Sequence, residues 1–283
     1  MVEISTLFEN YMPLIYGIIA VYGLFIITWL ISVFMKNAGV VDMIWGLGFV
    51  VQAAVYLSKD ADKGLNYPKI IFASLVMAHG LRLSFYIMFR GCGKPEDKRY
   101  KTIFRDKYGE NMWWVSFFLI FTFQALINLI VGMSLYAFES VQKLEDINLG
   151  AFFFGAAVMV IGTLYETIAD LQLYYFKTNP DNQGRVLNAG LWYFSRHPNY
   201  FGESVFWVGV YICNLSAVIW FTFFSPILMI FFIAFVSGVP ILERSMTVDY
   251  DSKYGNYIRT TSSFFPWCKF EDKEGDNQIP SDP

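Results

Sequence analysis

The sequence has few charged residues and few histidines or cysteines. Charged residues make up 16% of the chain and hydrophobic residues 55%, whereas charged residues are about 25% of a soluble domain. The formal net charge of −3 provides no field that would attract nucleic acid. The three cysteines, Cys92, Cys213 and Cys268, share no metal-ligand spacing and cannot all pair. These shortages exclude secreted disulfide scaffolds and nucleic-acid binders, and we predict free thiols and no metal site.

The sequence contains several long runs of apolar residues. A run of about 20 residues can cross ~30 Å of hydrocarbon as a helix. We expect spans at roughly 12–35, 40–58, 68–90, 112–138, 148–176, 200–213 and 218–239, the sixth being short enough for a re-entrant helix. The sequence therefore predicts an all-α polytopic membrane protein of about seven transmembrane helices. Residues 1–269 would form one domain in the lipid bilayer, with a cofactor-binding C-terminal half at about 148–269 and a polar tail at 270–283.

The positions of Lys and Arg support this topology. With seven spans, sixteen of the 21 basic residues fall on one face and four on the other, while Arg82 lies inside the third span. Positive charge collects in loops on the cytosolic side or its organellar equivalent. We therefore expect the loops at 91–111 and 177–199 to share one side with the C-terminus.

Polar side chains inside spans are costly and point to function by default. Seven such residues lie in or beside the apolar runs: Asp42, His79, Arg82, Glu166, Asp170, Glu203 and Glu243. Glu166 and Asp170 are four residues apart and Lys177 is seven further on, so all three project from nearly one face of the fifth span. They could bind a polar ligand or form an ion network with a neighbouring helix, and both interpretations stay open.

The segment after the fifth span ends at a helix start. Pro198 suits a first-turn position, and Ser195 or His197 can cap it. Free N–H groups and the positive end of the dipole at such a start, next to Arg185 and Arg196, suit a pyrophosphate. A cap plus anchoring arginines would explain these residues equally well, but not Asn199, Glu203 and His197 together at the mouth of a span.

This segment also carries a family resemblance. It reads Ser195-Arg196-His197-Pro198-Asn199-Tyr200-Phe201-Gly202-Glu203 and resembles the signature of membrane reductases that include steroid 5α-reductases and sterol C14 reductases. The chain is most similar to their small branch, the DUF1295 family. Further matching positions run from Asp42-Met43-Ile44-Trp45-Gly46 to Phe265-Pro266. The resemblance implies a steroid 5α-reductase-like bundle.

The resemblance implies an NADPH-dependent reductase of a hydrophobic, steroid- or lipid-like enone or other polarised double bond. The matching positions assign cofactor binding to Asp170, Arg185, Arg196, His197, Asn199, Tyr200 and Glu203, with Glu166, Lys177, Tyr254 and Tyr257 as further candidates. The Gln-Glu-Leu triplet that steroid 5α-reductases use at the substrate is absent from the sequence. Steroid specificity therefore does not carry over.

Hydride addition builds negative charge on a carbonyl oxygen, which needs a hydrogen-bond donor in a dry site. The donors that the front spans offer are Asp42, if protonated, Tyr86 and His79. Each also has an ordinary structural interpretation, and His79 stands where the reductases would be expected to carry an aromatic residue.

Two other functions stay open. Isoprenylcysteine and phospholipid methyltransferases share an Arg-His-Pro-x-Tyr-x-Gly pattern at a similar helix start and use S-adenosylmethionine. Asp42, Trp45-Gly46 and the Glu166–Asp170 pair favour the reductase. The third interpretation is an accessory subunit that keeps the reductase fold and binds other subunits of a membrane complex. The endoplasmic reticulum and the mitochondrial inner membrane both remain possible locations, since no retention signal or transit peptide is recognisable.

Overall fold

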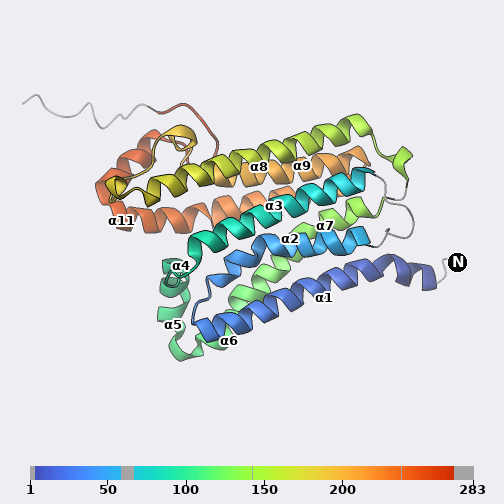
Figure 1. Ribbon diagram of the computed structural model, residues 1–283, viewed down its shortest axis with the longest axis horizontal. Helices are drawn as coiled ribbons and strands as arrows, with labels where there is room; N and C mark the ends of the chain where they lie inside the picture. The colour runs from blue at the N-terminus through green and yellow to red at the C-terminus, as the bar shows by residue number, and fades with distance from the viewer. Residues whose placement is uncertain (1–3, 59–66, 142, 237, 271–283) are drawn as a thin grey trace, which may run out of the picture. The chain divides into compact units, whose positions relative to one another are not determined.

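The computed structural model describes residues 4–58, 67–141, 143–236 and 238–270, in which all the regular structure is helical (Figure 1). The long helices are α1 (Ile4–Met35), α2 (Val40–Ser58), α3 (Tyr67–Gly91), α7 (Phe123–Glu139), α8 (Leu149–Thr178), α9 (Pro198–Ser216) and α11 (Val239–Thr260). Short helices α4 (Lys98–Tyr100), α5 (Asp106–Tyr108) and α6 (Met112–Ser116) lead with π-helical turns into α7, and α10 covers Phe224–Phe231. The prediction of an all-α membrane bundle is confirmed.

The helices follow the predicted spans closely. Six helical segments are long and apolar enough to cross a membrane, namely 12–35, 40–58, 67–91, 98–139, 149–178 and 220–247. Helix α9 corresponds to the remaining predicted span. It is regular over 19 residues, about 28 Å by the helical rise per residue, and is less apolar than the six. Helix α11, which hydropathy did not predict, is long but polar.

The chain divides into two compact units. Unit 1 comprises residues 1–159 and 207–228, and unit 2 comprises 160–206 and 229–283. Helices α8 and α9 contribute to both. The residues predicted to bind the cofactor, from Glu166 to Glu203 and Tyr254 to Tyr257, lie in unit 2, while Asp42, His79 and Tyr86 lie in unit 1. Apart from Phe270, the predicted polar tail lies outside the described residues.

Close helix packing in unit 1 depends on two glycines. Helix α2 packs against α1, α3 and α7 (Figure 1). A Cβ atom on Gly46 of α2 would lie 2.3 Å from the carbonyl oxygen of Gly80, and a Cβ on Gly80 would lie 2.5 Å from that of Gly46. Small residues let helix backbones approach in a membrane, where no hydrophobic force drives helices together. Gly46 and Gly80 therefore set the α2–α3 distance.

Buried amides join α2 to α7, and a phenol of α2 bonds to one of them. Gln52 Nε2 donates to Asn128 Oδ1 at 2.9 Å and to the Asn128 carbonyl at 3.2 Å, and Tyr56 Oη donates to Gln52 Oε1 at 3.2 Å. Asn128 Nδ2 donates to the Trp45 carbonyl at 3.0 Å. Gly48 and Gly132 leave the space that Asn128 and Gln52 fill. We call Gln52, Tyr56 and Asn128 the amide seam of unit 1.

Glycines at seven-residue spacing line the contact of α8 with α9. Within unit 1, a Cβ on Gly155 would lie 2.7 Å from the Cys213 nitrogen, and one on Gly209 would lie 2.6 Å from the Met159 nitrogen. Within unit 2, Gly162 and Gly202 approach Phe206 and Glu166 equally closely. Glycines seven residues apart share a helix face, so each helix presents a small-residue stripe to the other.

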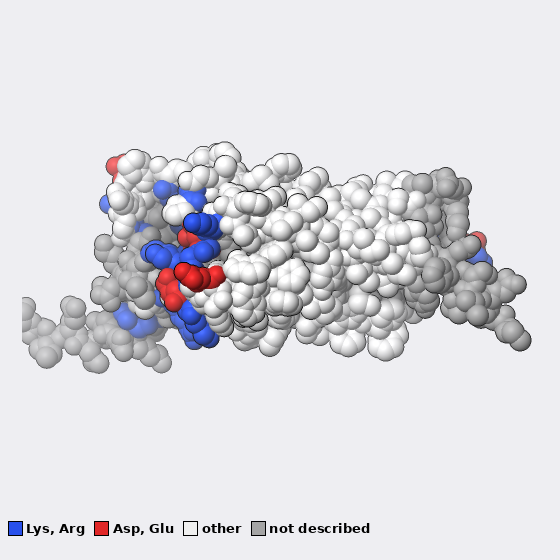
Figure 2. Space-filling view, turned by 90° about the horizontal axis from the view of Figure 1, so that it is seen from below, with Lys and Arg blue, Asp and Glu red and all other residues white. Residues whose placement is uncertain are grey.

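Charged side chains of unit 1 gather where α2 begins and α4 follows α3. Arg99 Nη2 lies 3.0 Å from Asp42 Oδ2 and 3.0 Å from Asp97 Oδ2. Arg105 bridges Glu96 with Nε–Oε2 and Nη2–Oε1 distances of 2.5 and 2.8 Å. Figure 2 shows acidic and basic side chains in one group beside a wide uncharged surface. On this face the exposed charge therefore lies toward the ends of the helices, as a bilayer requires.

Candidate functional site

The start of α9 is fixed by bonds of Ser195 to the residue before the helix and to the C-terminal segment. Ser195 Oγ accepts a hydrogen bond from the His197 N–H at 3.1 Å and donates to the Phe264 carbonyl at 2.8 Å. The His197 carbonyl accepts from Phe201 N–H, and Pro198 is the first helical residue. Proline suits that position because its missing N–H would have no intrahelical partner. The predicted helix start at Pro198 is thus present, whereas Ser195 bonds to the residue just before the helix and not to the N–H groups of its first turn.

Arg196 is buried and held by acceptors of the same unit. Its Nε donates to Glu243 Oε1 at 2.7 Å and its Nη1 to the Ile258 carbonyl at 2.8 Å and to the Thr261 carbonyl. Only 8% of its surface is exposed. These bonds tie the start of α9 to both ends of α11. A phosphate on Arg196 would have to share this guanidinium with Glu243, so the phosphate role stays a prediction.

His197 lies beside the same carboxylate. Its Nε2 is 3.3 Å from Glu243 Oε1, and its ring stacks on Tyr200 with centroids 5.5 Å apart and planes 9° from parallel. Burial lowers the pKa of His197 below 6.5, and the hydrogen bond with Glu243 offsets only part of that effect. His197 is therefore neutral at pH 7 and can present one N–H and one acceptor nitrogen.

Tyr254 and Tyr257 of α11 face the residues just before α9. Tyr257 Oη donates to the Trp192 carbonyl at 2.5 Å and to the Ser195 carbonyl at 3.2 Å. Burial raises the pKa of Tyr254 to about 12 and that of Tyr257 further. Both phenols therefore stay protonated, and Tyr257 uses its proton to hold the loop.

Four polar residues of α8 and α9 come together in unit 2. Asn199 Nδ2 lies 3.3 Å from Asp170 Oδ1. A carboxylate oxygen of Glu166 and one of Glu203 lie within 4.8 Å of each other. Asp170, Glu166 and Glu203 are 2%, 4% and 5% exposed. We call Glu166, Asp170, Asn199 and Glu203 the acidic cluster; it unites two predicted pairs that belong to different helices.

The remaining predicted cofactor residues lie around the loop after α8. Lys177, at the end of α8, and Arg185 are exposed. Tyr200 is half-buried on His197. The sequence did not single out Trp192 or Gln172, which brace this loop: Trp192 Nε1 donates to the Ala169 carbonyl at 3.0 Å, and Gln172 Oε1 accepts from Leu191 N–H at 2.9 Å. The available signal was Gln172 as a polar residue inside the fifth apolar run.

The predicted catalytic residues of unit 1 have different surroundings. Asp42 Oδ1 accepts from Tyr100 Oη at 2.6 Å, and Asp42 Oδ2 accepts from Arg99. His79 is 3% exposed on α3. Tyr86, seven residues along the same helix, is half-buried with the Arg90 guanidinium 5.5 Å from its ring centroid. His79 and Tyr86 share a helix face, whereas Asp42 is engaged as an acceptor.

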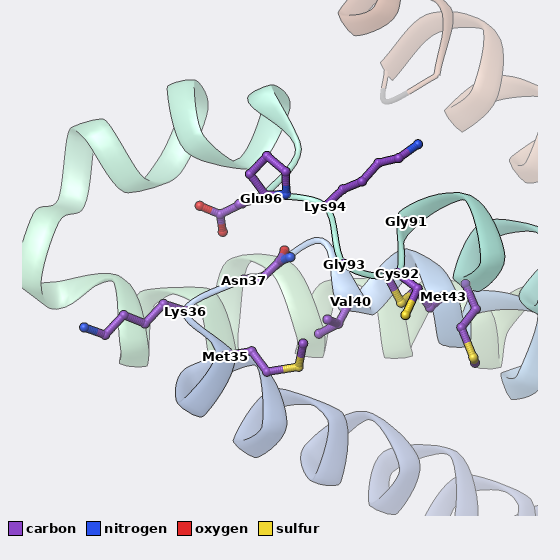
Figure 3. Close-up of a pocket in the computed structure, with 12 residues that line it drawn as sticks. Met35, Lys36, Asn37, Val40, Met43, Gly91, Cys92, Gly93, Lys94 and Glu96 are labelled. Atoms are coloured by element: carbon purple, nitrogen blue, oxygen red, sulfur yellow. The ribbon is translucent and has the colours of Figure 1, made fainter. Parts of the chain in front are cut away.

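A cavity of about 470 Å³ lies in unit 1, where α1 and α3 end and α2 begins (Figure 3). Its lining includes none of the residues predicted for catalysis or cofactor binding. Sequence patterns did not reveal it, because its walls come from three helices and from the α1–α2 and α3–α4 loops.

Comparison with known proteins gives one match. No curated protein and no solved structure matches the chain. The family described as protein of unknown function (DUF1295) matches residues 28–261, which include the end of α1 and all of α2 to α11. The resemblance seen in the Ser195–Glu203 segment thus extends over most of the molecule, and the chain belongs to the DUF1295 family.

Proposed function

We propose that the protein is a membrane-embedded, NADPH-dependent reductase of a hydrophobic enone or other polarised double bond. Support comes from unit 2, where buried polar side chains of two helices form the acidic cluster. Such groups are costly in a membrane protein and are retained where they serve a ligand or a reaction.

The main support for the proposal is one buried atom, the side-chain oxygen of Asn199. Asn199 Oδ1 is buried and accepts no hydrogen bond within the described part of the chain, although its Nδ2 is bonded to Asp170. A buried acceptor left without a donor costs about 1–3 kcal/mol. The carboxamide NH₂ of a nicotinamide offers donors that suit Asn199 Oδ1 and the neighbouring carboxylates of Asp170 and Glu203. The residues present therefore fit the nicotinamide half of the cofactor.

NADPH, when bound, supplies the hydride. Asn199, Asp170 and Glu203 would orient the carboxamide, and the exposed cations Lys177 and Arg185 would meet the phosphates. Arg196, Tyr257 and Trp192 would hold the loop in place through their bonds to carbonyls and to Glu243. Hydride addition requires a donor at the substrate carbonyl. His79 and Tyr86 suit that role better than Asp42, because Asp42 accepts hydrogen bonds from Arg99 and Tyr100.

Calorimetry with NADPH tests cofactor binding. Asn199→Ala removes the acceptor and should weaken binding about tenfold, the value of one buried hydrogen bond. Asn188→Ala is the matched control, since Asn188 is exposed on the loop of the same unit, and it should bind as the wild type does. Equal affinities for both variants would contradict the proposed carboxamide site.

Turnover is tested with a panel of lipophilic enones in nanodiscs. Glu203→Gln preserves size and hydrogen-bonding capacity but changes the partner pattern at the nicotinamide, and misplacement by ~1 Å can cost about 100-fold in rate. We expect NADPH oxidation to fall far more than thermal stability. Wild type that neither binds NADPH nor oxidises it would favour an accessory subunit of a membrane complex.

One observation favours a second function. The three buried carboxylates of the acidic cluster complement a cation, and S-adenosylmethionine carries a sulfonium and an ammonium group. A methyltransferase of the isoprenylcysteine or phospholipid type is therefore the alternative. Calorimetry with S-adenosylmethionine on the same sample separates the two, because the tighter ligand identifies the cofactor.

A further inference from the structure

The cavity of unit 1 lies at the ends of three membrane helices. Met35 is the last residue of α1, Gly91 the last of α3, and Val40 the first of α2, and all three line it (Figure 3). Since these helices are candidate membrane spans, their shared end marks the level where hydrocarbon gives way to water. The volume of about 470 Å³ is sufficient for a small molecule or a lipid headgroup.

The cavity wall is apolar and continues onto exposed helix surfaces. Methionine side chains from all three helices, Met35, Met43 and Met88, form part of the lining. Flexible thioether side chains adapt to ligands of irregular shape. Next to them, Phe34 on α1 is 87% exposed and Phe89 on α3 is 69% exposed. An acyl chain leaving the cavity would therefore meet apolar side chains along both helices.

The polar part of the lining has an excess of positive charge. Lys36 and Lys94 are exposed and stand on opposite sides of the cavity (Figure 3). The one lining carboxylate, Glu96, is bonded to Arg105 and accepts the Ala38 N–H at 2.8 Å. Burial would raise the pKa of Glu96, but the bonds from Arg105 and Ala38 lower it below 4.5. Glu96 is thus ionised and neutralised by Arg105, which leaves the two lysines to attract an anion.

We propose that this cavity binds the headgroup of an anionic phospholipid. The phosphate would lie between Lys36 and Lys94, whose side chains extend away from the cavity in Figure 3 and would turn inward on binding, and the acyl chains would follow α1 and α3 into the bilayer. A free phosphate would use the lysines but not the methionine wall, and a neutral lipid would use the wall but gain little from the lysines. The proposal does not depend on the reductase function.

Cys92 provides a direct probe, because it lines the cavity and is exposed. Cys268 is exposed in unit 2 and is the internal control, while Cys213 is buried. The full chain in detergent is labelled with a maleimide while dioleoylphosphatidylglycerol is added, and each thiol is followed by peptide mass spectrometry. We expect this lipid to slow labelling of Cys92 and leave Cys268 unchanged, and phosphatidylcholine to protect Cys92 far less.

Two double variants complete the experiment. A lysine near an anionic headgroup strengthens binding about fivefold, so Lys36→Ala with Lys94→Ala should raise the lipid concentration for half-protection ~30-fold. Lys101→Ala with Lys107→Ala makes the same charge change with two exposed lysines outside the lining, and should leave protection unchanged. Equal protection by both lipids, an unchanged Lys36/Lys94 variant, or equal protection by glycerol phosphate alone would overturn the proposal.

Discussion

The helices within unit 1 and the helices within unit 2 are held together by different kinds of polar contact. In unit 1, the amide seam links α2 to α7 through uncharged groups, with Gln52, Tyr56 and Asn128 bonding one another. In unit 2, the start of α9 is held by the ionised pair Arg196–Glu243 and by backbone carbonyls. Amides join helices without the desolvation penalty of a charge. Unit 2 therefore bears the larger desolvation cost at the start of α9, next to the candidate site.

The largest effect is expected at Arg196. Arg196→Met keeps much of the side-chain volume but leaves Glu243 and two carbonyls without their donor, and breaking a buried ion pair costs about 3–5 kcal/mol. Thermal unfolding in detergent measures it. Arg185→Met, at an exposed arginine of the same unit, should change stability by less than about 0.5 kcal/mol. Equal melting temperatures would mean that the ion pair does not hold unit 2 together.

The second-largest loss of stability is expected for Gly46→Ala, which tests the helix packing of unit 1. Its new Cβ would lie 2.3 Å from the backbone oxygen of Gly80, which cannot rotate away. Gly46→Ala should therefore destabilise by about 3 kcal/mol, the upper part of the range for overpacking. Gly23→Ala is the control, because a Cβ there meets nothing within 4 Å. A melting temperature for Gly46→Ala equal to that of Gly23→Ala would mean that α2 and α3 can separate freely.

Gln52→Leu should lower the free energy of unfolding by less than Arg196→Met or Gly46→Ala does. It removes three hydrogen bonds of the amide seam, each worth about 0.6 kcal/mol in a membrane protein, for a total of ~2 kcal/mol. The double variant Gln52→Leu with Asn128→Leu should recover part of the loss, because replacing both partners leaves fewer unsatisfied groups. If the double variant loses as much stability as the two single variants added together, Gln52 and Asn128 do not stabilise the fold as a pair.

The smallest effect concerns pH and His197. Because burial lowers the pKa of His197 in the folded protein, the unfolded chain binds the proton more readily. Stability should therefore decline as pH falls below about 6.5 and level off below the folded pKa. Melting temperatures from pH 7.5 to 5.5 test this, and His197→Asn should remove the dependence. His79, the other histidine of the chain, remains in both proteins.

The sequence predicted the spans because hydropathy is a local property. It also predicted the helix start at Pro198, and that residues one turn apart, such as Asn199 and Glu203, share a helix face, since these depend on local sequence and helix periodicity. It could not predict that Arg196 meets Glu243 forty-seven residues later, or that Asp42 meets Arg99 and Tyr100. Those contacts depend on how helices cross, and only the structure provides that. The sequence analysis did not predict helix α11, because its polar composition resembles that of a loop.

The glycine stripes between α8 and α9 have a consequence for biogenesis. Helix α9 is less apolar than the six clear spans, so as a nascent segment it would be recognised poorly by the insertion machinery. Its glycines let it press closely against α8, whose apolar run is strongly hydrophobic. We therefore expect α8 and α9 to enter the bilayer together as a helical hairpin. In that pair, contact with α8 would assist the membrane insertion of the less apolar α9.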